Sequence, residues 1–186
     1  VESVMGAYNR VNGEPACAST ELMKKLEEWG FDGHFVSDCW AIRDFHLNHK
    51  VTKTAPESAA LALKTGCDLN CGNTYIHLLI ALREGLITEE DIKKACVKLM
   101  RTRVRLGMFD EKTEYDSLDS EIVACEKHKA LSLECARRSM VLLKNNGILP
   151  LDRNKIKTIG VIGPNADSRA ALEGNYNGTA DRYITF

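Results

Sequence analysis

The first half of the chain alternates short apolar runs with amphipathic stretches in which apolar residues recur every three or four positions. An apolar run bounded by turn residues predicts a buried strand, and the longer period predicts a helix. Capping residues and Pro56 mark where helices begin, and Gly66, Gly85 and Gly107 mark where they end. The predicted elements are a strand over 1–7, a helix over 19–29, a strand over 34–38, a helix over 56–65, a strand over 67–70, and helices over 74–84 and 88–106. This alternation with short connections predicts parallel βα units.

The second half of the chain is less regular. We predict a long helix over 120–139, a strand over 140–144, a turn at 145–147, and a strand over 158–164 that begins another α/β domain. The predicted domains are residues 1–110, a linker and docking segment over 111–155, and an incomplete domain over 156–186. Apolar runs at both ends of the sequence suggest a piece of a longer polypeptide.

Composition excludes some functions. The 25 Lys and Arg residues nearly balance 26 Asp and Glu residues, so net charge gives no reason to expect nucleic acid or an anionic membrane as a partner. The sequence contains no run of 18 apolar residues, so it predicts no membrane span. The seven cysteines are scattered, and several occupy apolar helix positions. We therefore expect reduced thiols rather than a disulfide framework, and a cytoplasmic location with export left open.

Asp38 is the first candidate for chemistry, because it directly follows a predicted buried strand. In an α/β barrel, catalytic groups lie at the carboxyl ends of strands. An Asp at this position often caps the next helix instead, here one near residues 40–45, and the same alternative applies to Asp68. Tyr8 lies one βα unit earlier and would emerge on the same face. Its phenol could orient the Asp38 carboxylate and keep it ionised, or Tyr8 could simply end its strand.

Other motifs carry less weight. His46 and His49 could share a helix face, and Cys67 and Cys71 could offer two thiols, but a metal site needs three or four converging ligands. We expect no metal or cofactor, and we interpret the histidines as part of a solvated loop. Residues 159–165 superficially look like a nucleotide-binding turn, but they lack the three-glycine spacing and fit an internal strand better.

Five motifs, in this order and spacing, resemble glycoside hydrolase family 3 across nearly all of the chain. They are Tyr8-Asn9-x-x-Asn12-Gly13, residues 29–33 (WGFDG), Val36-Ser37-Asp38, Gly66-x-Asp68-Leu69-x-Cys71-Gly72, and Lys144-Asn145-x-x-Gly147 with the following ILPL. The resemblance implies a retaining exo-β-glycosidase. It also implies the fold: the C-terminal part of a (β/α)8-type barrel, a linker, and the beginning of an α/β sandwich.

The resemblance also implies roles for particular residues. Asp38 would be the nucleophile that forms a covalent glycosyl-enzyme, and Tyr8 would lie beside it. Met5 would line the sugar site, and Trp40 could stack on a sugar. Many members of the family carry Trp directly after the nucleophile, whereas here Cys39 intervenes.

The substrate is less well defined. Ser37-Asp38-Cys39 and residues 174–178 look more like the β-xylosidase and arabinosidase branch, whereas residues 44–50 depart from it. Xylose, arabinose and glucose therefore remain open. The expected partners are an oligosaccharide or glycoside and the remaining part of the same enzyme, with a homo-oligomer also open.

Part of the catalytic machinery has no counterpart here. The family's Lys-His segment and its upstream binding Asp do not occur before Tyr8, and Glu173 is a poor candidate for the general acid/base. The alternative function is therefore a non-catalytic carbohydrate-binding or structural fragment.

Overall fold

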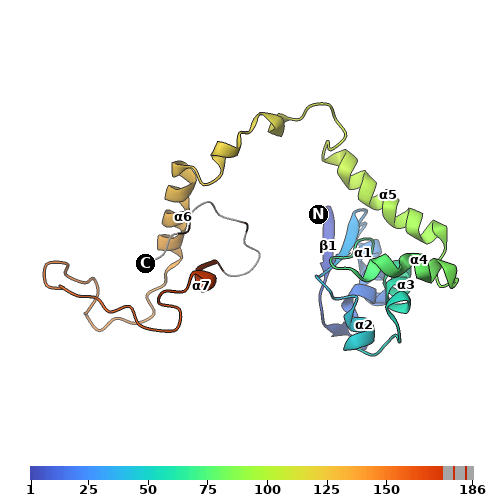
Figure 1. The fold of residues 1–186 in the computed structure, drawn as a ribbon, viewed down its shortest axis with the longest axis horizontal. Coiled ribbons are helices and arrows are strands. Elements are labelled where there is room, and N and C mark those ends of the chain that lie inside the picture. Colours follow the sequence, from blue (N-terminus) through green and yellow to red (C-terminus); the bar gives the residue numbers. More distant parts are fainter. Residues whose placement is uncertain (174–177, 179–182, 184–186) are drawn as a thin grey trace. The chain divides into compact units, whose positions relative to one another are not determined.

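The computed structural model describes residues 1–173, 178 and 183, which form two compact units. The N-terminal unit covers Val1–Leu118 and the C-terminal unit Asp119–Phe186, and each is described by itself. Figure 1 shows the elements along the chain. The predicted domain limits at residues 110 and 155 remain predictions.

The N-terminal unit contains the predicted alternation of strands and helices. Its strands are β1 (Ser3–Gly6), β2 (Arg10–Val11), β3 (Glu14–Pro15) and β4 (His34–Ser37). Its α-helices are α1 (Thr20–Glu28), α2 (Asp44–Leu47), α3 (Ala55–Thr65), α4 (Leu78–Arg83) and α5 (Glu89–Arg105). Short 3-10 turns occupy Ala16–Ala18, Thr74–His77 and Glu114–Ser117.

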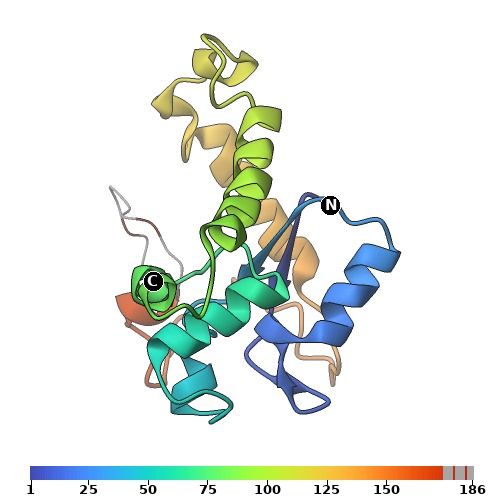
Figure 2. The same cartoon turned by 90° about the vertical axis from the view of Figure 1, so that its right-hand side faces the viewer.

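Strands β1 and β4 lie side by side and run parallel, with Gly6 opposite Ser37 (Figures 1 and 2). The predicted third strand is reduced to a single parallel bridge between Val36 and Leu69. Three strand segments, at residues 3–6, 34–37 and 69, therefore have their carboxyl ends on one edge. The α/β prediction is confirmed at this level, but the described residues form no closed barrel.

Local signals fix the helix ends. The Ser19 hydroxyl accepts a hydrogen bond from the Leu22 amide at the start of α1, and Thr54 caps α3 in the same way. Helix α3 ends at Gly66, whose φ of 119° is a left-handed conformation that glycine adopts without steric cost. Thr88 and Asp91 form a capping box at α5. These boundaries agree with the sequence prediction.

The core lies between the strands and the helices that follow them. Phe35 of β4 packs with Ile42, Phe45 and Cys67 in one cluster, and burial of each large side chain contributes about 1.5–3 kcal/mol. A second cluster joins α3, α4 and α5 through residues that include Leu63, Ala81, Ile87 and Ala95. Packing of this kind fixes the strand ends on which the candidate site is built.

The C-terminal unit contains a 3-10 turn at Ser120–Ile122, α6 (Glu126–Ser139) and α7 (Arg169–Glu173). The predicted helix over 120–139 is thus interrupted, with Ala124 in a left-handed conformation (φ 53°). The predicted strands over 140–144 and 158–164 are wrong, because both segments lie outside regular structure. A strand needs a hydrogen-bonded neighbour, and neither segment has one among the described residues.

No described helix combines the length and apolar character needed to cross a membrane.

Candidate active site

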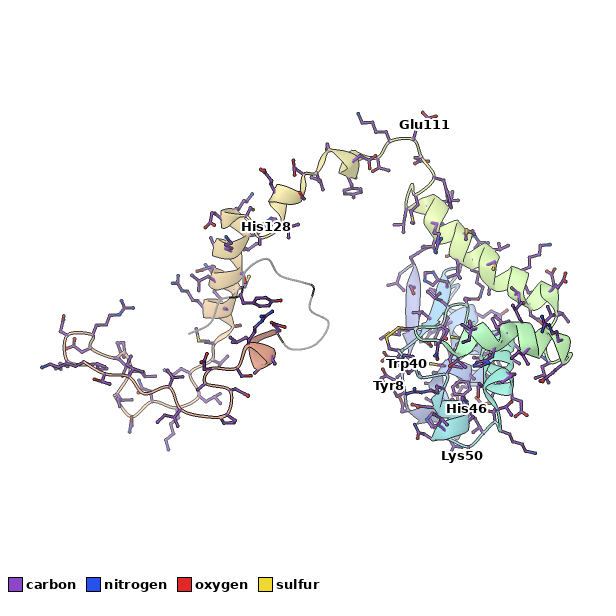
Figure 3. The ribbon with its side chains drawn as sticks, viewed as in Figure 1. Tyr8, Trp40, His46, Lys50, Glu111 and His128 are labelled. Carbon is purple, nitrogen blue, oxygen red and sulfur yellow. A yellow bond between two sulfur atoms is a disulfide. The ribbon has the colours of Figure 1, made fainter. Side chains whose placement is uncertain are left out.

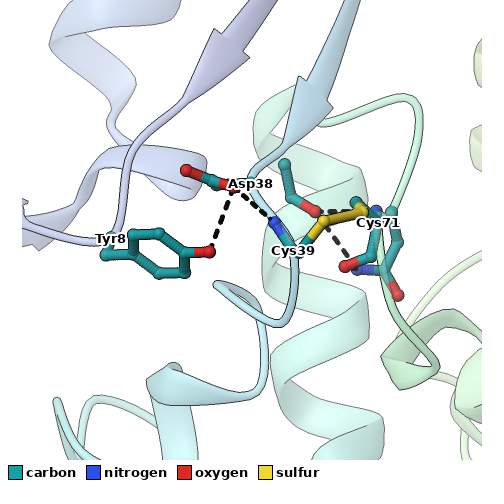
Figure 4. Close-up of a disulfide and its surroundings, with 6 residues drawn as sticks. Tyr8, Asp38, Cys39 and Cys71 are labelled. Atoms are coloured by element: carbon teal, nitrogen blue, oxygen red, sulfur yellow. Dashed lines mark hydrogen bonds between the residues drawn. A yellow bond between two sulfur atoms is a disulfide. The ribbon is translucent and has the colours of Figure 1, made fainter. Parts of the chain in front are cut away.

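The Asp38 carboxylate lies directly after β4 and is half-buried. Its Oδ1 accepts two hydrogen bonds, one from the Tyr8 hydroxyl at 3.0 Å and one from the Cys39 amide at 2.7 Å. Figure 4 shows both donors directed at this oxygen. Within the described part of the chain, no hydrogen bond to Oδ2 is present. One carboxylate oxygen is therefore held by two donors.

The strand register brings Tyr8 and Asp38 together. Gly6 lies opposite Ser37, and the Asp38 amide donates to the Gly6 carbonyl at 2.9 Å, so both chains leave the sheet at the same edge. The predicted placement of Tyr8 and Asp38 on one face is confirmed. Asp38 does not cap the next helix, because α2 begins with Arg43 as its N-cap and has no side-chain cap.

Asp68 has a structural role instead. Its side chain is buried, accepts a hydrogen bond from the Phe35 amide at 2.9 Å, and forms an ion pair with Lys98 at 3.1 Å. It thus ties the third strand segment to β4 and to α5. The capping alternative is therefore wrong for Asp68 as well.

The loops after β4 and after Leu69 are held together by a buried hydroxyl. Ser37 is fully buried, and its Oγ accepts hydrogen bonds from the Cys71 amide at 3.0 Å and from Asn70 Nδ2 at 3.1 Å. The Trp40 amide donates to the Cys71 carbonyl at 2.8 Å. Residues 37–40, which include Asp38, and residues 70–72 are therefore held together.

A disulfide between Cys39 and Cys71 joins the same two loops (Figure 4). The expectation that the cysteines are all reduced is therefore wrong for this pair. The two residues are 32 positions apart in sequence, and the pairing of Val36 with Leu69 places their loops side by side, with the two Cα atoms 4.4 Å apart. The expected cytoplasmic location, with export left open, stays a prediction. Free cysteines in the described residues are Cys17, Cys67, Cys96, Cys125 and Cys135.

Trp40 and Met5 lie in different surroundings (Figure 3 labels Trp40 in the N-terminal unit). The Trp40 ring is partly exposed, and the Arg43 guanidinium lies 4.7 Å from its centroid. Met5 is exposed on β1 and lines a hollow of about 300 Å³ formed with α1, which neither Tyr8 nor Asp38 lines. The geometry thus joins Tyr8 with Asp38 but does not join Met5 to them.

The other candidate ligands do not converge. His46 Nδ1 lies 2.9 Å from the Ser58 hydroxyl, and partial burial together with nearby positive groups lowers the His46 pKa. Burial raises the pKa of the Cys17 thiol to about 11 and that of Cys67 to about 12, so both thiols stay protonated. Among the described residues, no group of three or more His, Cys, Asp or Glu side chains could hold a metal ion.

Sequence reasoning missed the group that supports Asp38, namely Ser37, Asn70 and the Cys39–Cys71 pair. The sequence signal for this group is the position of these residues directly after two adjacent strand segments. Ser37-Asp38-Cys39 and Asn70-Cys71 end adjacent parallel strand segments, so their polar side chains must meet. The segment 174–178, which suggested the xylosidase branch, lies outside the described residues except for Gly178.

Comparison with known proteins identifies relatives of this chain. Beta-D-xylosidase 1 of Arabidopsis thaliana is 40% identical over 191 residues, which cover 100% of this chain and 24% of that protein. A solved exo-β-xylosidase in complex with a xylobiose aziridine probe matches with a TM-score of 0.82 and 32% identity, covering 100% of this chain and 25% of its own. A β-glucosidase from Listeria innocua in complex with glucose matches with a TM-score of 0.66 and 28% identity, covering 80% of this chain and 21% of its own.

The chain spans about a quarter of the length of the curated relatives that it matches. Residues 1–102 match the N-terminal domain of glycosyl hydrolase family 3, and residues 140–186 match the C-terminal domain of the same family. This chain is therefore a member of glycosyl hydrolase family 3.

Proposed function

We propose that the chain is part of a longer retaining exo-β-glycosidase in which Asp38 is the nucleophile. The observation that carries the proposal is the placement of Asp38 at the carboxyl end of β4, with Tyr8 and the Cys39 amide both donating to Oδ1. Such a carboxylate is oriented by one oxygen and can attack with the other. In this proposal, the strands that complete the barrel come from the rest of the same polypeptide.

The proposed reaction has two steps. Oδ2 of Asp38 attacks the anomeric carbon, the bond to the leaving-group oxygen breaks, and a glycosyl-Asp38 ester forms. Water then attacks the same carbon from the opposite face and releases the sugar with net retention. Protonation of the leaving group requires a second carboxyl group, which we assign to the rest of the polypeptide.

The proposed substrates are glycosides with a terminal, non-reducing β-xylosyl or β-glucosyl residue. The names of similar proteins support xylose first, because curated β-xylosidases are 37–41% identical to this chain over 94–100% of its length. A solved β-glucosidase covers 98% of the chain at 27% identity, so glucose is the second candidate. Xylose differs from glucose by the absence of a hydroxymethyl group, so the residues around the bound sugar would determine which of the two fits.

The test uses the full-length polypeptide with aryl β-xyloside, α-arabinoside and β-glucoside. We expect Asp38→Asn to lower kcat by at least about a thousandfold, because an amide cannot form the ester. The matched control is Asp152→Asn, which alters an exposed carboxylate in the C-terminal unit and leaves turnover unchanged. A xylose-configured aziridine should label Asp38 in the unmodified protein and leave the Asn variant unlabelled, as read by peptide mass spectrometry.

Turnover that survives Asp38→Asn would show that the nucleophile is a different residue. Absence of turnover with all three glycosides, together with saturable sugar binding, would favour the alternative of a carbohydrate-binding protein.

A further inference from the structure

We infer that the Cys39–Cys71 disulfide positions the Asp38 carboxylate, so that the full-length enzyme needs this bridge for full turnover. The inference rests on the proposed function, because it assigns a role to residues that act through the proposed nucleophile. Cys39 and Cys71 are positioning residues here, since neither is assigned any contact with the sugar.

The first step of the argument is the hydrogen bond from Cys39. Its amide donates to Asp38 Oδ1 at 2.7 Å, and it belongs to the peptide that directly follows Asp38. A rotation of that peptide would turn the Cys39 N–H away from Oδ1 and remove this hydrogen bond. The second donor, the Tyr8 hydroxyl, comes from the chain after β1 and fixes the same oxygen from the other side.

The second step is the attachment of Cys39 to the neighbouring loop. The disulfide joins it to Cys71, whose amide donates to the buried Ser37 Oγ and whose carbonyl accepts from the Trp40 amide. Cys71 thus holds the residues on both sides of Asp38 and Cys39. The disulfide is the covalent member of this set, and it adds to the hydrogen bonds that already join the two loops.

The third step is the backbone at Trp40. Its φ of 69° is a left-handed conformation, which bulky residues rarely adopt and which persists only when the surroundings hold it. Trp40 directly follows Cys39, and Gly72 directly follows Cys71. A Cβ atom at Gly72 would lie 3.3 Å from the Trp40 amide nitrogen, so the two loops are in close contact there. Loss of the bridge would let Trp40 relax to an ordinary conformation, and the Cys39 amide would turn with it.

Both cysteines are half-buried, so a small dithiol can reach them. Dithiothreitol reduces the bridge by thiol–disulfide exchange: the S–S bond breaks, two thiols form, and the reductant becomes its cyclic disulfide, supplying two electrons and two protons. Reduction therefore tests the inference in the unmodified enzyme.

The experiment compares the full-length enzyme with the Cys39→Ser/Cys71→Ser double variant. The matched control is Cys96→Ser, which alters an exposed free cysteine on α5. The aziridine probe gives two separate quantities, its affinity and the rate constant for labelling Asp38. We expect the labelling rate constant and kcat to fall about tenfold in the double variant, because misplaced reacting groups lose rate steeply, while probe affinity and KM change less than about twofold. A general loss of folded protein would lower the labelled fraction rather than this rate constant.

Dithiothreitol should lower the labelling rate constant of the unmodified enzyme to that of the double variant, leave the double variant unaffected, and be reversed by reoxidation. The dithiothreitol experiment also tests the inference if the double variant does not fold. Unchanged labelling rates in the double variant, or in the reduced enzyme with both thiols titrated as free, would overturn the inference. Turnover that survives Asp38→Asn would instead overturn the proposed function, whatever the cysteine variants do.

Discussion

At the scale of single residues, the candidate site depends on how one carboxylate is held. Asp38 receives both donors on Oδ1, one from a neighbouring strand end and one from the next peptide. A hydrogen bond to a charged acceptor is worth more than one between neutral groups, about 1.5–3 kcal/mol. The two donors therefore differ in origin but act on the same atom, and their effects should not be additive.

We predict that Tyr8→Phe lowers kcat about thirtyfold, which corresponds to about 2 kcal/mol for the lost hydrogen bond. The ring remains, so the change removes only the hydroxyl that orients Asp38. Steady-state kinetics of the full-length enzyme with an aryl β-xyloside measures it. The matched control, Tyr115→Phe, changes an exposed tyrosine of the N-terminal unit and should leave kcat within twofold. A Tyr8→Phe enzyme with unchanged kcat would contradict the orienting role.

At the scale of elements, ion pairs and hydrogen bonds join α5 to residues just before β1 and β4. Arg105 donates to Glu2 at 2.8 Å and to Asp32 at 3.0 Å, and Thr102 donates to the other oxygen of Glu2. The hydrogen bond from Thr102 and the Arg105 guanidinium lower the pKa of Glu2, and Arg105 lowers the pKa of Asp32. These contacts lie at the amino ends of β1 and β4, away from Asp38.

This cluster predicts a pH dependence of stability. Because both carboxyl groups have lower pKa values in the folded state, their stabilisation is complete above the ordinary carboxyl range near pH 4 and is lost as the pH falls through the lowered values. We predict that Arg105→Gln reduces the urea midpoint of the full-length polypeptide at pH 7, and that the difference from the unmodified protein disappears towards about pH 2–3. Arg103→Gln, on the exposed side of the same helix turn, is the control. A difference that persists undiminished at the lowest pH would disprove the linkage.

At the scale of the whole molecule, much apolar surface remains uncovered. Trp29 is 76% exposed, Leu143 92% and Ile162 96%, and the buried hydrophobic residues of the described chain all lie between Ala16 and Ala95. Among the described residues, strand β1 pairs with β4 alone, which leaves its other edge open. Open edges and apolar faces of this size need covering elements for stability.

We predict that the 186-residue chain, expressed alone, melts without a sharp cooperative transition and binds a hydrophobic dye strongly. The expected cause is the open edge of β1 and the exposed apolar segment 140–143, which the described residues leave uncovered. Calorimetry and dye fluorescence measure both properties, with the full-length polypeptide as the cooperative, weakly binding control. A two-state melt of the isolated chain, with equal calorimetric and van't Hoff enthalpies, would contradict the prediction.

The sequence by itself determined the local elements of the N-terminal unit. Helix ends at Ser19, Thr54, Gly66 and Thr88 follow from capping groups within a few residues, and the apolar run before Ser37 predicts a strand from its own pattern. The pairing of Tyr8 with Asp38 was also predictable, because consecutive parallel strands end on the same edge.

Only the tertiary structure decided what depends on contacts between distant residues. It turned Cys39 and Cys71 from expected free thiols into a bridge, because the short contact at Leu69 brings two loops together that are 32 positions apart. It left 140–144 and 158–164 without strand structure, because apolar pattern alone supplies no hydrogen-bonding neighbour. Periodicity and caps act within one turn or one strand, whereas a disulfide or a sheet needs a partner whose place only the folded chain sets.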